Sequence, residues 1–203
     1  MGYILVILLG YLLGCSNMAY YVARLKKVEI RSGGSGNLGA SNATILLGWW
    51  AGILVAVHDI GKSVLAVMLA KLFFPDLAHA GAVAGVASVL GHIFPFYLKF
   101  KGGKGFASYI GMILALNWKF ALVILALVVV VTVVTDYIVM GTTLTIVTSP
   151  IYLGLTSGSL LLAAILCIAT AVIIYKHRKN YVNIYKGTEL GLRSAIRGDN
   201  RVK

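Results

Sequence analysis

The chain's candidate chemistry lies in polar stretches that interrupt an otherwise apolar sequence. The first spans residues 31–42 and combines glycines with short hydroxyl and amide side chains. Glycine lets a backbone adopt conformations closed to other residues and approach a ligand closely, and successive N–H groups in such a loop form a concave anion site. A flexible connector is the alternative, but a linker would tolerate any polar residue. The stretch predicts phosphate binding, with candidate ligands Ser35, Gly36, Asn37, Gly39, Ser41 and Asn42.

A second stretch, residues 91–105, ends in the basic sequence Lys-Gly-Gly-Lys-Gly. Two ammonium groups on a flexible backbone suit an anionic ligand. The stretch is not a Walker loop, because neither Ser nor Thr follows Lys104. A basic turn that only sets membrane topology is the alternative, and a lone histidine such as His92 is more often structural than catalytic. The candidate residues are His92, Lys101, Gly102, Gly103 and Lys104.

A third group lies near the carboxyl end. If a helix continues through it, His177 and Asn180 lie three residues apart on one face. Residues 187–189, Gly-Thr-Glu, would then break the helix and return a carboxylate toward that face. A basic terminus whose side chains snorkel to the membrane surface is the alternative, and we prefer it for residues 193–203. The candidate residues are His177, Asn180, Gly187, Thr188 and Glu189.

Other polar residues within apolar segments have plainer interpretations. The Thr142 hydroxyl could simply bond to the backbone of its own helix, although we keep it as a candidate ligand. Asp59 and Lys62, three residues apart, predict a structural ion pair, yet charges within a membrane are candidates for function by default. Residues 34–39 formally match the dinucleotide pattern G-x-G-x-x-G, but they lack the strand–loop–helix setting that this fingerprint requires.

The elements that must position these residues are membrane helices. Hydrophobic residues make up 60% of the 203 residues, against about 45–50% in ordinary globular proteins, and the mean hydropathy is +0.92. The apolar runs are solid rather than alternating, which favours helices over barrel strands. We predict an all-α polytopic integral membrane protein with about seven transmembrane helices in one membrane-embedded domain, 1–203. The expected spans are 2–23, 44–73, 78–97, 106–116, 120–134, 140–155 and 160–175.

The charge balance predicts the orientation of these spans. The 18 Lys and Arg against 6 Asp and Glu give a net charge of +12. In a soluble protein this excess would suggest nucleic acid, which we do not expect as a partner here. In a membrane protein it indicates cytoplasmic loops near anionic lipid. Most of the cations fall on one side if the amino terminus is outside and the carboxyl terminus cytoplasmic. The polar stretches then share the cytoplasmic face.

The motifs together resemble those of the bacterial membrane glycerol-3-phosphate acyltransferases that use acyl phosphate as donor. The resemblance rests on residues 35–42, on Gly91-His92 with residues 101–105, and on His177-x-x-Asn180 with residues 187–189. It covers nearly the whole chain, including the seven spans and Asp59-x-x-Lys62. One position departs from the family: Ile45 stands where an arginine is usual, which removes a phosphate contact.

The resemblance implies acyl transfer from acyl phosphate to the 1-hydroxyl of glycerol 3-phosphate, which gives lysophosphatidic acid and inorganic phosphate in phospholipid biosynthesis. It implies a bacterial cytoplasmic (inner) membrane location. We expect neither a cofactor nor a metal, because the charged cluster is cationic rather than rich in carboxylates, and a monomer is the working expectation. The catalytic residues expected from it are Ser35, Lys104, His177 and Asn180. A small transporter or channel for phosphorylated metabolites is the alternative, and it predicts internal repeat symmetry with polar residues at mid-membrane in several spans.

Overall fold

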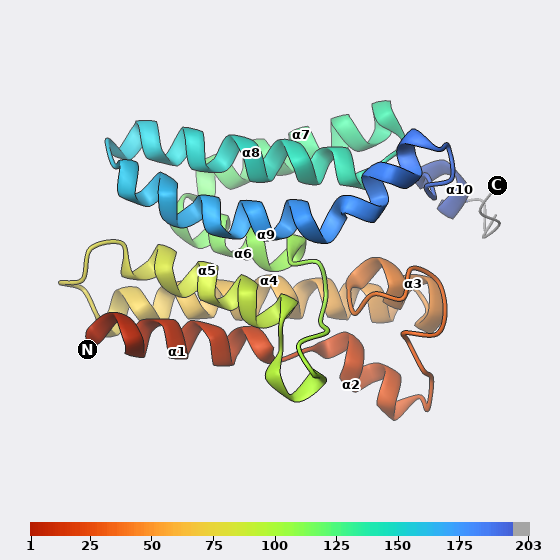
Figure 1. Cartoon of the computed structure of the whole chain (residues 1–203), viewed down its shortest axis with the longest axis horizontal. Coiled ribbons are helices and arrows are strands. Elements are labelled where there is room, and N and C mark those ends of the chain that lie inside the picture. The colour runs from red at the N-terminus through yellow and green to blue at the C-terminus, as the bar shows by residue number, and fades with distance from the viewer. Residues whose placement is uncertain (197–203) are drawn as a thin grey trace. The chain divides into compact units, whose positions relative to one another are not determined.

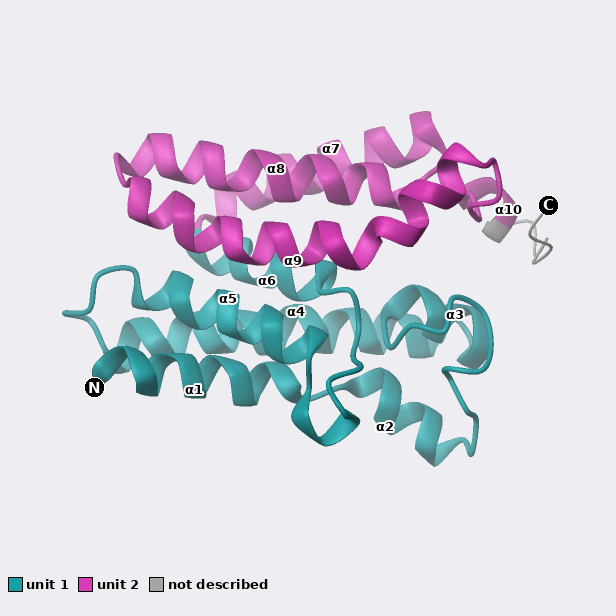
Figure 2. Ribbon diagram, viewed as in Figure 1, with its two compact units in different colours: residues 1–116 teal, residues 117–203 magenta. Residues whose placement is uncertain are grey.

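The computed structural model describes residues 1–196, and every regular element in that range is a helix. The chain divides into two compact units, residues 1–116 and residues 117–203 (Figures 1 and 2). Each unit is described by itself below. The expectation of a single domain stays a prediction, and the part of the proposed basic terminus at residues 197–203 lies outside the described residues.

Unit 1 begins with a broken apolar helix. The sequence predicted one span over 2–23, whereas the structure has α1 (Gly2–Cys15) and α2 (Met18–Leu25) with a break between them. The break forms because the Asn17 side chain accepts a hydrogen bond from the backbone N–H of Tyr20, at 2.9 Å, and so caps the new helix. Together the two helices still form one candidate membrane span.

The second predicted span, 44–73, is also divided, and the division explains its excess length. A short helix, α3 (Ala40–Leu47), is followed by the 25-residue α4 (Trp49–Phe73). Gly48 separates them with a φ of +94°, a conformation that other residues rarely adopt. At about 1.5 Å per residue, α4 alone is long enough to cross a hydrocarbon core of about 30 Å.

Small residues bring α1 against α5 (Ala80–Ile93), the helix of unit 1 in which nearly all residues are buried. A Cβ atom at Gly10 would overlap the backbone of Ala84, and one at Gly14 would overlap the backbone of Ser88. Small residues spaced four apart let membrane helices approach closely. The close α1–α5 contact follows from this pattern (Figure 1).

The rest of unit 1 carries the second polar stretch. The 3-10 turn η1 (Phe96–Leu98) follows α5, and a loop then leads into α6 (Phe106–Leu116). The predicted span 106–116 coincides with α6. Its 11 residues extend only about 16 Å at 1.5 Å per residue, too short for a full crossing.

Unit 2 contains α7 (Trp118–Thr135), α8 (Ile138–Ser157), α9 (Leu160–Tyr185) and the short α10 (Leu192–Ile196), and α7, α8 and α9 run antiparallel in succession (Figure 1). Asn117 and Ser159 cap α7 and α9 through bonds of 3.0 and 3.1 Å to backbone N–H groups. The predicted last span, 160–175, lies within α9. The helix continues beyond this apolar segment, through the basic residues that follow it, and ends at Tyr185.

Six of these segments are long and apolar enough to cross a membrane, and α6 is a shorter apolar helix. Among these candidate membrane helices α7 is the most hydropathic, and it leaves Val129, Val130, Val133 and Val134 exposed on its surface. Contiguous apolar surface of this kind marks a face that contacts lipid. The prediction of an all-α polytopic membrane protein with about seven helices is confirmed, while the orientation of its termini stays a prediction.

Candidate active site

The first loop, residues 31–39, is held closed by Asn42. The Asn42 side chain is buried, and its oxygen accepts a hydrogen bond from the Ser35 backbone N–H at 2.8 Å. Its amide nitrogen donates to the Ile30 carbonyl, also at 2.8 Å. Gly34 and Gly36 have positive φ values of 56° and 64°, which the tight turn requires. In the structure the Asn42 amide thus shapes the loop, whose backbone presents the other candidate residues.

These other residues lie at the amino terminus of α3. Ser35, Gly36 and Ser41 are exposed, and Asn37 and Gly39 are half-buried. Gly39 is the N-cap of α3. The first N–H groups of a helix lack partners within the helix, and the helix dipole favours negative charge there. A glycine-rich loop that leads into a helix amino terminus is the arrangement that binds phosphate in many proteins.

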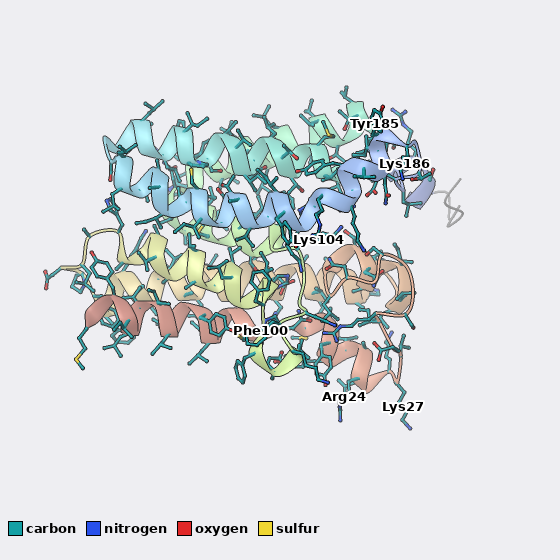
Figure 3. All side chains as sticks on the ribbon, in the orientation of Figure 1. Arg24, Lys27, Phe100, Lys104, Tyr185 and Lys186 are labelled. Atoms are coloured by element: carbon teal, nitrogen blue, oxygen red, sulfur yellow. The ribbon has the colours of Figure 1, made fainter. Side chains whose placement is uncertain are left out.

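The second loop, residues 99–105, folds back against the end of α5. The Gly102 N–H donates to the Ile93 carbonyl at 3.0 Å, and the Gly103 N–H donates to the His92 carbonyl at 3.1 Å. A Cβ atom at Gly102 would overlap the His92 carbonyl oxygen, and one at Gly103 would overlap His92 Nε2. Both glycines are therefore required by the close approach. Lys104 follows them and is half-buried (Figure 3).

The two loops lie side by side within unit 1. The Arg31 guanidinium donates a hydrogen bond to the Lys101 carbonyl. A Cβ atom at Gly103 would also lie 2.8 Å from the Leu38 carbonyl oxygen. The structure thus brings together the first two groups of predicted residues, and it adds Arg31 as a link that spacing alone did not identify.

The third group lies in unit 2. His177 is buried on α9, and its Nδ1 lies 2.9 Å from the Ile173 carbonyl oxygen. A carbonyl oxygen only accepts, so Nδ1 carries the proton and Nε2 keeps its lone pair in the neutral ring. One turn on, the Asn180 amide donates to the Glu189 carboxylate. The predicted continuation of the helix through His177 and Asn180 and the returning carboxylate are confirmed.

The returning turn depends on Gly187. Its φ is +68°, and the Thr188 N–H then donates to the Asn183 carbonyl at 2.8 Å. These features end α9 in the manner of a left-handed carboxyl-terminal cap. The turn places Glu189, half-buried, beside Asn180.

On α8, the Thr142 hydroxyl donates to the Ile138 carbonyl at 3.1 Å, and its side chain is buried. The Thr142 hydroxyl thus bonds to the backbone of its own helix, which was the alternative to a role as a ligand. The adjacent Thr143 hydroxyl lies 2.8 Å from the Tyr181 hydroxyl, and this contact, which joins α8 to α9, was not predicted. The sequence could have pointed to Tyr181, because it lies four residues after His177 and therefore on the same face of the helix.

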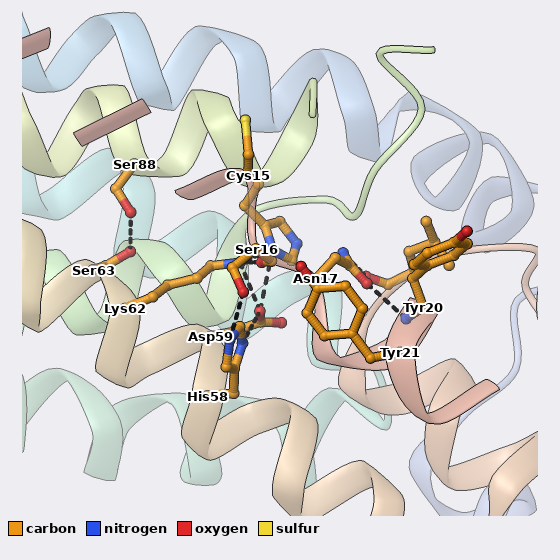
Figure 4. A network of polar contacts seen from close by, with 12 residues as sticks. Cys15, Ser16, Asn17, Tyr20, Tyr21, His58, Asp59, Lys62, Ser63 and Ser88 are labelled. Carbon is orange, nitrogen blue, oxygen red and sulfur yellow. Dashed lines mark hydrogen bonds and ion pairs between the residues drawn. The ribbon is translucent and has the colours of Figure 1, made fainter. Parts of the chain in front are cut away.

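The ion pair predicted between Asp59 and Lys62 is present, with 2.8 Å between Lys62 Nζ and Asp59 Oδ1 and both side chains buried. The sequence did not reveal its third member. His92, only 3% exposed, places Nδ1 2.9 Å from Lys62 Nζ. Figure 4 shows the Asp59–Lys62 pair beside Ser16, at the break between α1 and α2.

Known proteins match this chain over nearly its whole length. Residues 4–187 match the model of a family described as glycerol-3-phosphate acyltransferase. Glycerol-3-phosphate acyltransferase 1 of Oceanobacillus iheyensis is 34% identical, with 96% of this chain and 97% of that protein covered. The glycerol-3-phosphate acyltransferase of Clostridioides difficile is 38% identical, with 93% and 94% covered.

Solved structures agree with these relatives. The crystal structure of PlsY, an integral membrane glycerol 3-phosphate acyltransferase, in its glycerol 3-phosphate form has a TM-score of 0.89 at 29% identity, over 96% of this chain and 98% of that one. The lysophosphatidic acid form gives a TM-score of 0.85 at 29% identity, over 94% and 95%. The chain therefore belongs to the glycerol-3-phosphate acyltransferase family of integral membrane proteins.

Proposed function

We propose that this protein transfers an acyl group from acyl phosphate to the 1-hydroxyl of glycerol 3-phosphate, which gives lysophosphatidic acid and inorganic phosphate. One observation carries the proposal. The similar crystal structures were determined in a glycerol 3-phosphate form and a lysophosphatidic acid form. These ligands are the acceptor and the product of this one reaction, and the similarity extends over at least 94% of the chain.

The chemistry suits a site that binds anions. The 1-hydroxyl oxygen attacks the acyl carbonyl carbon, the bond from that carbon to the phosphate oxygen breaks, and inorganic phosphate leaves. Acyl phosphate is already activated, so positioning two anions and neutralising their charge supplies much of the rate. The two loops of unit 1 lie side by side; the first leads into the amino terminus of α3 and the second carries Lys101 and Lys104, which supports a phosphate-binding role for them.

We assign Lys104, Ser35 and the backbone of residues 36–42 to phosphate binding. The Lys104 ammonium neutralises phosphate charge, and the first loop donates N–H groups at the start of α3. The predicted ligands Lys101, Gly102 and Gly103 belong to the second loop, in which both glycines keep the backbone close to α5. Thr142 and the turn at residues 187–189 remain proposed ligands in unit 2.

His177 and Asn180 are assigned to the acyl phosphate. The hydrogen bond between His177 Nδ1 and the Ile173 carbonyl leaves Nε2 as the acceptor nitrogen. Nε2 is thus the atom that would take the proton of the attacking hydroxyl if a side chain acts as the base. A substrate phosphate oxygen is the other acceptor for this proton, and it needs no protein base.

The transporter alternative has less support. A transporter would be expected to show internal repeat symmetry, and the sequence has no repeat that we can identify. The relatives with which this chain shares 34% and 38% identity over most of its length are acyltransferases. For the reaction to draw on cytoplasmic substrates, we place the loops of unit 1 on the cytoplasmic face of a bacterial inner membrane. The charge asymmetry of the sequence supports this orientation.

The purified protein in detergent tests the proposal. Palmitoyl phosphate and glycerol 3-phosphate are added, inorganic phosphate release is followed, and lysophosphatidic acid is measured by mass spectrometry, with acyl-CoA as the control donor. Product from acyl phosphate alone supports the proposed reaction. Phosphate release without an acylated product would reduce the activity to hydrolysis, and no reaction from folded protein would overturn the proposal.

A further inference from the structure

A buried polar network lies between the broken helix α1–α2, α4 and α5, on the side of the second loop. We propose that Asp59 and Lys62 are positioning residues, which hold the second loop and its Lys104 in place through the His92 ring and Gly103. The inference rests on the proposed function for its catalytic consequence. It also revises the expected role of His92, which then packs against Gly103 of the second loop rather than contacting the substrate.

The first step is the arrangement around Lys62. Its ammonium nitrogen lies 2.8 Å from Asp59 Oδ1, 2.7 Å from the Ser16 carbonyl oxygen and 2.9 Å from His92 Nδ1. An ammonium donates hydrogen bonds and accepts none, so a neutral His92 ring meets Lys62 with its acceptor nitrogen. His92 Nδ1 is then the acceptor, and the neutral ring carries its proton on Nε2. The His92 ring is therefore oriented by Lys62 and by Asp59, whose Oδ1 lies 3.3 Å from the same Nδ1.

The second step leads from His92 to the loop. The Gly103 N–H donates to the His92 carbonyl at 3.1 Å, and His92 Nε2 occupies the space where a side chain at residue 103 would begin. Gly103 is thus held against His92 by backbone and ring together, and it is buried. Lys104 is the next residue, so a shift of the His92 ring moves the lysine that we assign to phosphate binding.

The third step extends the network to the first loop. His58 Nε2 lies 3.0 Å from the Ser16 hydroxyl, and the adjacent Asn17 donates to the Leu38 carbonyl at 3.4 Å. The Leu38 carbonyl in turn faces Gly103. The break between α1 and α2 therefore contacts the same point at which the two loops meet.

Joining α4 to α5 does not require the charged side chains of Asp59 and Lys62. Ser63 and Ser88 link α4 to α5 by a hydroxyl–hydroxyl contact of 2.9 Å, away from the loops (Figure 4). Burying an ion pair carries a desolvation cost that a hydroxyl pair largely avoids. A charged network retained beside a neutral link indicates a task that the neutral link does not perform, and it offers a matched control.

The experiment compares two double variants in detergent. Asp59→Asn/Lys62→Met removes both charges and leaves neither alone, and Ser63→Ala/Ser88→Ala removes the neutral link between the same helices. If the two variants have similar thermal unfolding midpoints, the charge-free variant should lose about 100-fold in kcat/KM for acyl transfer. This is the scale of loss expected when a catalytic group is misplaced by about 1 Å. The serine variant should stay near wild type. Equal activities would overturn the proposal.

A second measurement does not depend on the activity. Trypsin cleavage after Lys99, Lys101 and Lys104 is timed and mapped by mass spectrometry, because a loop released from its support opens more often. Cleavage in the charge-free variant should accelerate about tenfold over the serine variant, and an unchanged rate would overturn the positioning role. If the wild-type protein formed no lysophosphatidic acid, the proposed reaction would fail while the cleavage comparison still decided this inference.

A double-mutant cycle covers the case in which the charge-free variant does not fold. Gly103→Ala is made in the wild type and in His92→Ala, and trypsin cleavage of the loop is compared in all four proteins. If the His92 ring supports Gly103, the added Cβ meets less obstruction once the ring is gone. The effect of Gly103→Ala should then be smaller in the His92→Ala background, and equal effects would contradict the proposed contact.

Discussion

The Arg31 guanidinium of the first loop donates a hydrogen bond to the Lys101 carbonyl of the second loop. The contact joins two segments that are far apart in the sequence and adds a cation at the place where they meet. Arg31 is otherwise exposed, so its side chain is held mainly by the geometry of the two loops. The link between the loops can therefore be tested by removing one side chain.

Arg31→Ala should lower kcat/KM for acyl transfer about tenfold, because a hydrogen bond from a charged group contributes about 1.5–3 kcal/mol and the exposed position of Arg31 favours the low end of that range. Arg24→Ala is the matched control, since Arg24 is also exposed in unit 1 but donates to the Tyr20 hydroxyl at 3.1 Å. Steady-state kinetics with both substrates measures the difference. Equal activity of the two variants would show that the contact between the loops is dispensable.

Lys104→Ala should reduce acyl transfer at least about 100-fold while the protein stays folded, because the lysine is assigned to neutralise the phosphate charge of the substrates. Lys99→Ala, in the same loop but exposed, should retain most of the activity. Product formation is followed by mass spectrometry, and folding by the thermal unfolding midpoint. Near-normal activity of Lys104→Ala would remove this residue from the site.

Ile45→Arg should lower the KM for glycerol 3-phosphate. Ile45 lies on α3 with its side chain partly exposed, close to Gly34 of the first loop. An arginine there adds a charge-assisted contact to phosphate, which corresponds to about a tenfold gain. Ile45→Met keeps the apolar character as a control. The gain should shrink as salt is raised, because exposed charges are screened, and a gain that salt leaves unchanged would argue against a charge effect.

Asn180 and Glu189 allow a test that separates support from substrate contact. Asn180→Asp sets two carboxylates against each other and should destabilise the end of α9. Adding Glu189→Gln restores one donor and one acceptor, so the double variant should regain its unfolding midpoint. Activity should stay low, since the Asn180 amide is assigned to the acyl phosphate. Full recovery of activity would instead make Asn180 a purely structural residue.

Gly14→Ala should lower the thermal unfolding midpoint, because its Cβ would overlap the Ser88 backbone where α1 packs on α5. Gly61→Ala on α4 is the control, since a Cβ there meets nothing within 4 Å. It should stabilise the helix by about 0.5–1 kcal/mol. A Gly14→Ala protein as stable as Gly61→Ala would mean that α1 and α5 can separate without cost.

Much of the architecture could be predicted from the sequence, and the reason is the membrane itself. In hydrocarbon every backbone polar group must be satisfied within its own segment, so a long apolar run becomes a helix whatever surrounds it. The segment 106–116 was predicted with the bounds of α6, and residues 187–189 predicted the turn that returns Glu189 toward Asn180. These features depend on residues close together in the chain.

The tertiary structure decided the features that depend on distant partners. Hydropathy is an average over many residues, so it did not reveal the breaks at Asn17 and Gly48, which one side-chain cap and one positive φ produce. Spacing identified Asp59 and Lys62 as a pair because both lie on one helix. It could not add His92, which belongs to α5 and contacts Lys62 of α4 only in the folded unit, where Gly10 and Gly14 also let α1 pack closely on α5.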